Sequence, residues 1–299
     1  MAGSGDVPAL VLPRAGTTLA DERSLDGDSG AASCGLESGA VGVRMATPSS
    51  PTPAMNAAGT PRLLLLETSG QPGQVGLAEG TELVRSASLP VARRHARDLA
   101  PTVQQLLREQ GWRPRELHAV AVGQGPGSYT GLRVGIMSAK ALAYALQIPI
   151  LAVETFAILA LQAGSGADLH VLEDAQQDKV YVQVFRFLPG QSRPEPVTAL
   201  AIERFADWLA AVPPGVRVTG PALETFAVRL PAHVTPLPPA LWRPQLPAML
   251  TVALDLWSRQ ETADMWKLEP LYLRPSEAEE AWERRRPDHK DFAPRIPGP

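Results

Sequence analysis

One glycine-rich stretch limits what this chain can fold into more than any other. Residues Gly123 to Gly135 read GQGPGSYTGLRVG, between an apolar run at Leu117 to Val122 and helical spacing from Leu132 to Leu146. This order of patterns predicts a buried strand, a turn and a helix. Ser128 or Thr130 can cap that helix. In such a turn, backbone N–H groups point outward at the N-terminal, positive end of the helix dipole. This arrangement is suited to binding an anion.

We therefore predict an anion or nucleotide site at this turn. Arg133 follows the turn within the helix, so its guanidinium is better placed than that of any later cation to reach a bound anion. The predicted site consists of Gly125, Gly127, Ser128, Tyr129, Thr130 and Arg133.

Small residues recur every four positions along the same helix, at Gly131, Gly135, Ala139 and Ala143. Residues four apart share one helix face, so another helix could approach this ridge closely. Two interpretations are open. Internal packing is the more common reason for such a ridge in a water-soluble protein, and a subunit interface is the alternative.

Composition is ordinary for a globular protein of one or two domains, with 299 residues, 44% hydrophobic and 20% charged. The net charge of -3 provides no global basic field, so any contact with RNA must come from a local patch. Cys34 is the only cysteine, which excludes an intrachain disulfide and a zinc site built on several thiolates. No run of eighteen apolar residues occurs, and we expect a cytoplasmic protein without a membrane span.

Both ends of the chain differ from the middle. Residues 1–61 are dominated by Gly, Ala, Ser, Thr and Pro and contain no aromatic residue, which predicts disorder. They form either a flexible extension or a misassigned start, with translation beginning at Met45 or Met55. Residues 276–299 are charged and proline-rich and are predicted to be a tail.

The ordered middle reads as an α/β protein with two lobes, residues 62–165 and 166–275. Each lobe is expected to hold a mixed sheet with an antiparallel meander and flanking helices. In the first lobe the predicted strands are Leu63–Glu67, Gln74–Ala78, Glu82–Ser88, Leu117–Val122 and Pro149–Val153. An amphipathic helix with Pro101 inside it precedes the fourth strand, and Pro101 should kink it. The second meander begins with strands at Leu169–Glu173 and Lys179–Phe187.

The stretch GQGPGSYTGLRVGIMSAKALAYALQIPILAVET resembles the signature of the TsaB (YeaZ) family. This family contains small bacterial members of the actin, sugar-kinase and chaperone-ATPase superfamily. Three further segments resemble it in the same order: the opening strand and turn at Leu63 to Ser69, the helix that follows His95, and PLYLRPSEAE at Pro270 to Glu279. The resemblance covers about residues 62 to 280 and implies a two-lobed actin-like ATPase (ribonuclease H-like) fold.

The resemblance also implies a function. TsaB-like proteins are partner subunits in the synthesis of threonylcarbamoyladenosine beside the anticodon of tRNAs that read codons starting with A. A TsaD-like paralogue is the catalytic subunit, a TsaE-like ATPase assists, and tRNA binds through the complex. No tightly bound cofactor is expected, although ATP or ADP could bind at the complex interface.

We expect the partner to bind two helices, and without it the same surface could form a homodimer. The predicted interface residues are His95, Leu99, Val103 and Leu106 on the proline-containing helix, and Gly131, Leu132, Gly135, Ile136, Ala139 and Ala143 on the helix after the glycine-rich turn. Arg93, Arg94 and Arg97 surround His95, and either nearby acids or tRNA phosphates offset their charge.

The sequence departs from the family pattern at Glu67, where Asp is usual, at Ala96, where Ser is frequent, and at Gln176, where Arg is usual. These departures weaken an independent nucleotide site. The competing interpretation is a stand-alone ATP-binding phosphotransferase or hydrolase that uses Glu67 and Asp174. A peptidase is the weakest alternative, because no two of the five histidines lie within five residues of each other and a zinc site usually needs several convergent ligands. We predict no catalytic residue and no metal site.

Overall fold

The computed structural model describes residues 60–90, 95–188 and 193–271. The predictions for residues 1–59 and 276–299, including the disordered extension and the tail, lie outside this part of the chain. Within the described residues, no helix is long and apolar enough to cross a membrane.

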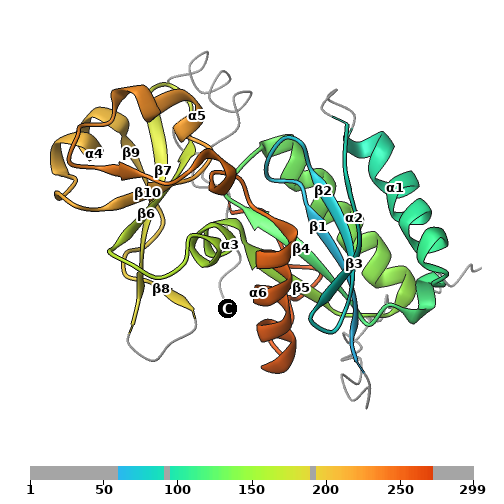
Figure 1. Cartoon of the computed structure of the whole chain (residues 1–299). Coiled ribbons are helices and arrows are strands. Elements are labelled where there is room, and N and C mark those ends of the chain that lie inside the picture. The colour runs from blue at the N-terminus through green and yellow to red at the C-terminus, as the bar shows by residue number, and fades with distance from the viewer. Residues whose placement is uncertain (1–59, 91–94, 189–192, 272–299) are drawn as a thin grey trace, which may run out of the picture. The chain divides into compact units, whose positions relative to one another are not determined.

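The first sheet has five strands in the order β3-β2-β1-β4-β5 (Figure 1). Strands β1 to β3 form the predicted antiparallel meander, and β4 and β5 extend it in parallel with β1. Strand β1 is buried almost completely because consecutive leucines face opposite sides of a sheet that helices cover on both faces. The strands are β1 Arg62–Glu67, β2 Gln74–Glu79, β3 Glu82–Ser88, β4 Ala119–Gly125 and β5 Ile150–Glu154.

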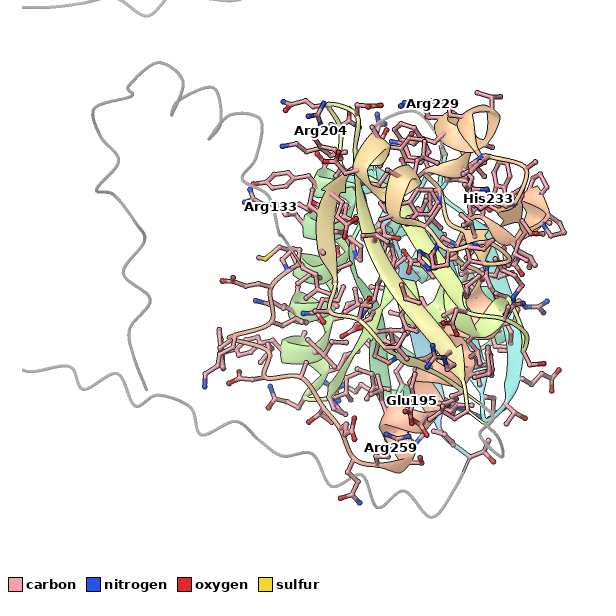
Figure 2. All side chains as sticks on the ribbon, turned by 90° about the vertical axis from the view of Figure 1, so that its left-hand side faces the viewer. Arg133, Glu195, Arg204, Arg229, His233 and Arg259 are labelled. Atoms are coloured by element: carbon pink, nitrogen blue, oxygen red, sulfur yellow. The ribbon has the colours of Figure 1, made fainter. Side chains whose placement is uncertain are left out.

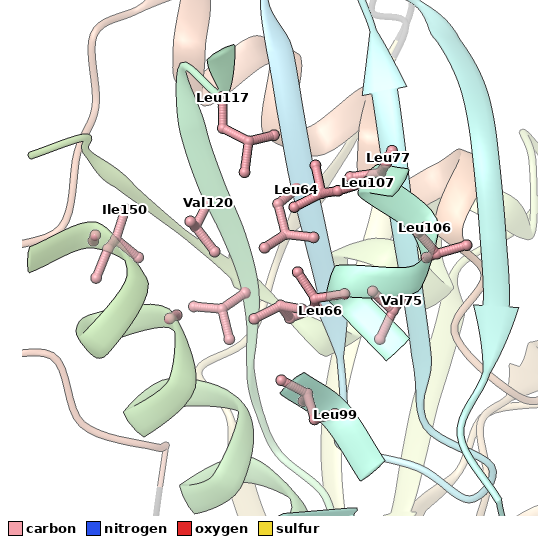
Figure 3. Close-up of a cluster of buried hydrophobic side chains, with 14 of the residues drawn as sticks. Leu64, Leu66, Val75, Leu77, Leu99, Leu106, Leu107, Leu117, Val120 and Ile150 are labelled. Carbon is pink, nitrogen blue, oxygen red and sulfur yellow. The ribbon is translucent and has the colours of Figure 1, made fainter. Parts of the chain in front are cut away.

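Helices α1 (His95–Gln110) and α2 (Tyr129–Leu146) cover one face of this sheet. Figure 3 shows Leu99, Leu106 and Leu107 of α1 lying over the leucines of β1 and β2. The helical assignment of α1 continues through Pro101, and the predicted kink stays a prediction. A short 3-10 helix, η1 (Pro114–Glu116), connects α1 to β4.

Helix α6 (Leu246–Ser258) packs on the opposite face of the first sheet, together with α3 (Thr155–Gln162). Met249, Leu250 and Ala253 of α6 are buried against Leu63 and Leu65 of β1. The predicted division placed this helix in the second lobe, so its packing requires a correction. The order of elements along the chain does not predict this packing. The apolar stripe of α6 covers the face of β1 that α1 and α2 leave open, and β1 lies far from α6 in the sequence.

The second sheet has six strands, with the order β11-β10-β6-β7-β8 and with β9 paired to β7. Strands β6 and β7 are the predicted antiparallel pair, while β10 and β11 run parallel to β6. The strands are β6 Leu169–Asp174, β7 Lys179–Phe187, β8 Pro194–Pro196, β9 Ala201–Arg204, β10 Arg217–Thr219 and β11 Thr235–Pro236. The helices of this region are α4 Phe205–Ala211, α5 Leu223–Phe226, η2 Ala227–Arg229 and η3 Pro239–Leu241.

Each sheet has its own buried cores. The second sheet packs Phe205, Trp208 and Phe226 on one face and Phe156 with Phe185 on the other. The two mixed sheets, each with an antiparallel meander and flanking helices, confirm the predicted α/β class.

Candidate functional site

The glycine-rich turn is packed against the turn that follows β1. Ser128 caps α2, because its Oγ accepts a hydrogen bond from the Gly131 N–H at 3.2 Å, as its position in the sequence predicts. The Ser128 N–H donates to the Ser69 carbonyl at 2.7 Å, and a Cβ on Gly127 would meet the same Ser69 group. The N–H groups of Ser128 and Gly131 therefore already have partners within the chain.

The small-residue ridge of α2 faces inward. Gly131, Gly135, Ala139 and Ala143 are all buried. A Cβ on Gly131 would fall on the Thr68 carbonyl oxygen, and a Cβ on Gly135 would fall on Thr68 Oγ1. Close approach does explain the glycines, but the approaching group is Thr68, directly after β1, and not a second protein.

The predicted interface therefore needs correction. Its described members are buried in the core of this chain: Leu99, Val103, Leu106, Gly131, Leu132, Gly135, Ile136, Ala139 and Ala143. The side chain of His95, like Arg93 and Arg94, lies outside the described residues, whereas Arg97 is exposed on α1. The helical spacing of apolar residues identified the stripe by which α1 and α2 each pack on the first sheet.

Glu67 closes the carboxyl end of β1. Its side chain is 2% exposed, its Oε1 accepts from the Ser69 N–H at 2.7 Å, and its Oε2 lies where a Cβ on Gly123 would stand. Among the described residues, Oε2 has no hydrogen-bond partner, and neither has the buried Oγ1 of Thr155 at the start of α3. Burial raises the pKa of the Glu67 carboxyl, and the hydrogen bonds with Ser69 offset this only in part.

Glu173, at the end of β6, is a titratable residue that the sequence analysis missed. Burial raises the pKa of its carboxyl to about 8, and repulsion from Asp174, Glu224 and Glu67 acts in the same direction. Its position on the strand could have revealed it, because Leu169 and Val171, at alternate positions, belong to one buried cluster. The charge of Glu67 thus acts on Glu173 at the end of β6, and burial raises the pKa of both carboxyls.

These features do not favour a magnesium–nucleotide complex held by this chain alone. A raised pKa weakens Glu67 as a magnesium ligand, since Mg²⁺ takes ionised carboxylate oxygens. No group of three or more His, Cys, Asp or Glu suited to a metal occurs in residues 60–90, 95–188 and 193–271. A nucleotide at an interface with a partner stays a prediction.

The β6–β7 turn is strained. Gln176, Gln177 and Asp178 have φ values of 63°, 55° and 58°, a left-handed conformation that costs a non-glycine residue about 1 kcal/mol or more. Contacts on either side hold it, because the Gln176 N–H donates to Asp174 Oδ1 and Asp178 pairs with Arg229. Arg229 and Arg204 mark this end of the second sheet in Figure 2.

Replacing Gln176 with glycine should therefore raise the free energy of unfolding by roughly 0.5 to 1 kcal/mol, because glycine adopts positive φ without steric cost. Gln104→Gly, in the exposed middle of α1, is the matched control and should lower it by a similar amount. Urea unfolding of both variants checks this. Equal destabilisation by the two changes would show that the turn is not strained.

The solvent side of α2 carries apolar and basic side chains. Met137 and Tyr144 are 62% and 56% exposed, and Arg133 and Lys140 alternate with them at helical spacing. Trp266, which is 59% exposed, meets Tyr144 edge to face with ring centroids 6.1 Å apart. Arg133 stacks on Tyr129 at 4.3 Å and points outward in Figure 2. We call Arg133, Met137, Lys140, Tyr144 and Trp266 the α2 face.

Comparisons with known proteins match both the sequence and the fold. Residues 89–242 match the family model described as TsaD, tRNA N6-adenosine threonylcarbamoyltransferase. YeaZ from Pseudomonas aeruginosa superposes with a TM-score of 0.62 at 30% identity, over 71% of this chain and 100% of that protein. The chain belongs to the TsaB/YeaZ family.

Two relatives named tRNA threonylcarbamoyladenosine biosynthesis protein TsaB are similar over nearly their whole length. The Bacillus subtilis (strain 168) protein is 28% identical over 74% of this chain and 97% of its own. The Escherichia coli (strain K12) protein is 27% identical over 71% and 94%. The resemblance inferred from the glycine-rich stretch is confirmed.

Proposed function

We propose that this TsaB/YeaZ family member is a non-catalytic subunit that acts with a TsaD-like catalytic paralogue in the biosynthesis of threonylcarbamoyladenosine in tRNA. The names of its relatives and the match to the TsaD model support involvement in this biosynthesis. A TsaE-like ATPase and the tRNA would join through the complex, and the isolated chain could pair with itself. In this role the chain supplies a binding surface and not reacting groups.

The α2 face is the observation that carries the proposal. Met137, Tyr144 and Trp266 are exposed, and Tyr144 contacts Trp266. Exposed apolar side chains that lie on one face of a protein are typical of protein contacts. Helix α2 contains two basic residues and no acidic one, so a partner surface with acidic groups around apolar ones would complement it. The α2 face thus replaces the buried ridge as the proposed contact for the TsaD-like protein.

A double substitution tests this contact. Met137→Glu with Tyr144→Glu should leave the fold intact, because both side chains are exposed, and should weaken binding to the TsaD-like protein of the same organism by roughly a hundredfold or more. Light scattering behind a sizing column and calorimetric titration measure the complex. Val228→Glu, at a residue that is 92% exposed on η2, is the control that should bind normally.

Binding that survives the double substitution would exclude this surface. If the wild-type chain also did not bind a well-folded TsaD-like protein, the proposed subunit role would be refuted. The competing phosphotransferase is favoured only by the electrostatic interaction between Glu67 and Glu173. It predicts ATP turnover by the isolated chain that Glu67→Gln abolishes.

A further inference from the structure

The described chain ends beside the start of α2. The Leu271 N–H donates to the Gln124 carbonyl at 3.0 Å, and Gln124 Nε2 donates to the Glu269 carbonyl at 2.9 Å. Gln124 lies at the end of β4, five residues before α2 begins at Tyr129. The residues that follow Leu271 are therefore tethered close to the N-terminal end of the α2 face.

One acidic stretch of the sequence that follows, between Arg274 and the run Arg284 to Arg286, is opposite in charge to the α2 face. Residues Ser276 to Glu283 read SEAEEAWE and contain four glutamates and one tryptophan. The α2 face presents two cations and three large apolar side chains, and Lys140 makes no ion pair within the described residues. Opposite charge and shared apolar character make the two surfaces complementary.

The tether is long enough. Helix α2 has 18 residues, which corresponds to about 27 Å at 1.5 Å per residue. Five extended residues after Leu271 span roughly 17 Å, and a further seven bring Glu283 within reach of the far end of the helix. A segment attached at this distance has a high effective concentration at the surface, so weak individual contacts suffice.

We propose that residues 276–283 of this chain bind the α2 face, with the glutamates near Arg133 and Lys140 and the Trp282 ring against the exposed apolar side chains. The segment shields the patch in the isolated protein and competes with an external partner. The competition rests on the proposed function, because competition requires that the TsaD-like protein bind the α2 face. The shielding of the α2 face in the isolated protein does not depend on the proposed function.

A zero-length carbodiimide cross-link tests the shielding in the full-length protein. It should join Lys140 to one of Glu277, Glu279, Glu280 or Glu283 in the monomer, and mass spectrometry of the digest identifies the pair. Lys140→Arg should remove the product, since guanidinium does not react. An equal mixture of 15N-labelled and unlabelled chains distinguishes a cross-link within one chain from a cross-link between two chains. Products that mix isotopes would assign the contact to a second copy and overturn the proposal.

Met137 oxidation is the second measurement. Changing the four glutamates to glutamine together should speed peroxide oxidation of Met137 by roughly threefold or more, because oxidation follows exposure. An unchanged rate, together with no Lys140 cross-link, would refute the contact. Urea unfolding of the variant checks that the four changes leave the fold intact.

Affinity for the TsaD-like protein then separates the two claims. The same four changes should tighten binding by roughly threefold or more, because the surface no longer has to be uncovered first. A cross-link with unchanged affinity would overturn the competition. If the TsaD-like protein bound neither form, the proposed function would fail while the cross-link still supported the shielding.

Discussion

Replacing Gly131 with valine should prevent this chain from folding stably. A Cβ at this position would fall on the carbonyl oxygen of Thr68, and it would also crowd the Ser128 side chain that caps the helix. Thr68 follows β1 directly, in the middle of the sheet, so its backbone cannot move without disturbing the pairing with β4. We expect a loss of about 3 to 5 kcal/mol in the free energy of unfolding, which would remove most of the stability of an ordinary domain.

Urea unfolding followed by circular dichroism measures this loss. Ala141→Val is the matched control, because Ala141 is exposed on the same helix and the change should cost only a few tenths of a kcal/mol through helix propensity. A Gly131→Val protein with a wild-type unfolding midpoint would contradict the packing described for α2. For the same reason a larger residue at Gly135 could not test the predicted partner interface, since Thr68 Oγ1 already occupies the space.

The stability of this protein should fall as pH rises from about 5 to 9, and Glu173→Gln should remove much of that slope. Burial raises the pKa of Glu173 from 4.5 to about 8. Between these values the folded protein keeps the proton and the unfolded chain releases it. The folded state therefore binds more protons, and the free energy of unfolding decreases with pH until the folded carboxyl also ionises.

The expected decrease from this group is on the order of 2 to 4 kcal/mol, smaller than full conversion of the shift because Glu173 is only partly buried. Glutamine cannot ionise, so the variant should exceed the wild type in stability at pH 9 and approach it near pH 5. Glu82→Gln, at an exposed glutamate of β3, is the control and should keep the wild-type slope. Parallel curves for Glu173→Gln and wild type would show that this carboxyl is ionised in the folded protein at neutral pH.

Local patterns predicted the elements well where each pattern had a direct physical cause. The run of leucines from Leu63 predicted β1, which the structure buries on both faces. A hydroxyl residue before a helical stretch predicted a cap at Ser128 or Thr130, and Ser128 makes it. The strand–turn–helix reading of Gly123 to Gly135 was confirmed, because glycine and proline restrict the backbone whatever surrounds them.

Sequence patterns gave wrong predictions where the result depended on which part of the fold packs against a helix. The ridge on α2 permits a close approach, but only the fold decides that Thr68 makes it. Leu99, Val103 and Leu106 were expected at an interface, yet amphipathic spacing alone cannot distinguish a stripe that faces a sheet from one that faces a partner. The α2 face was missed because Met137, Tyr144 and Trp266 are apolar residues that a sequence would place in the core.

The sequence by itself determined the order of the elements, the cap of α2, the glycine-rich turn and the family. Each depends on residues adjacent in the chain, whose backbone preferences act locally. Only the tertiary structure decided that α6 returns to the first sheet, that the charge of Glu67 acts on Glu173, and which side of α2 faces solvent. These results depend on how surfaces that are distant in sequence pack against one another. The burial that shifts a pKa exists only after this packing has formed.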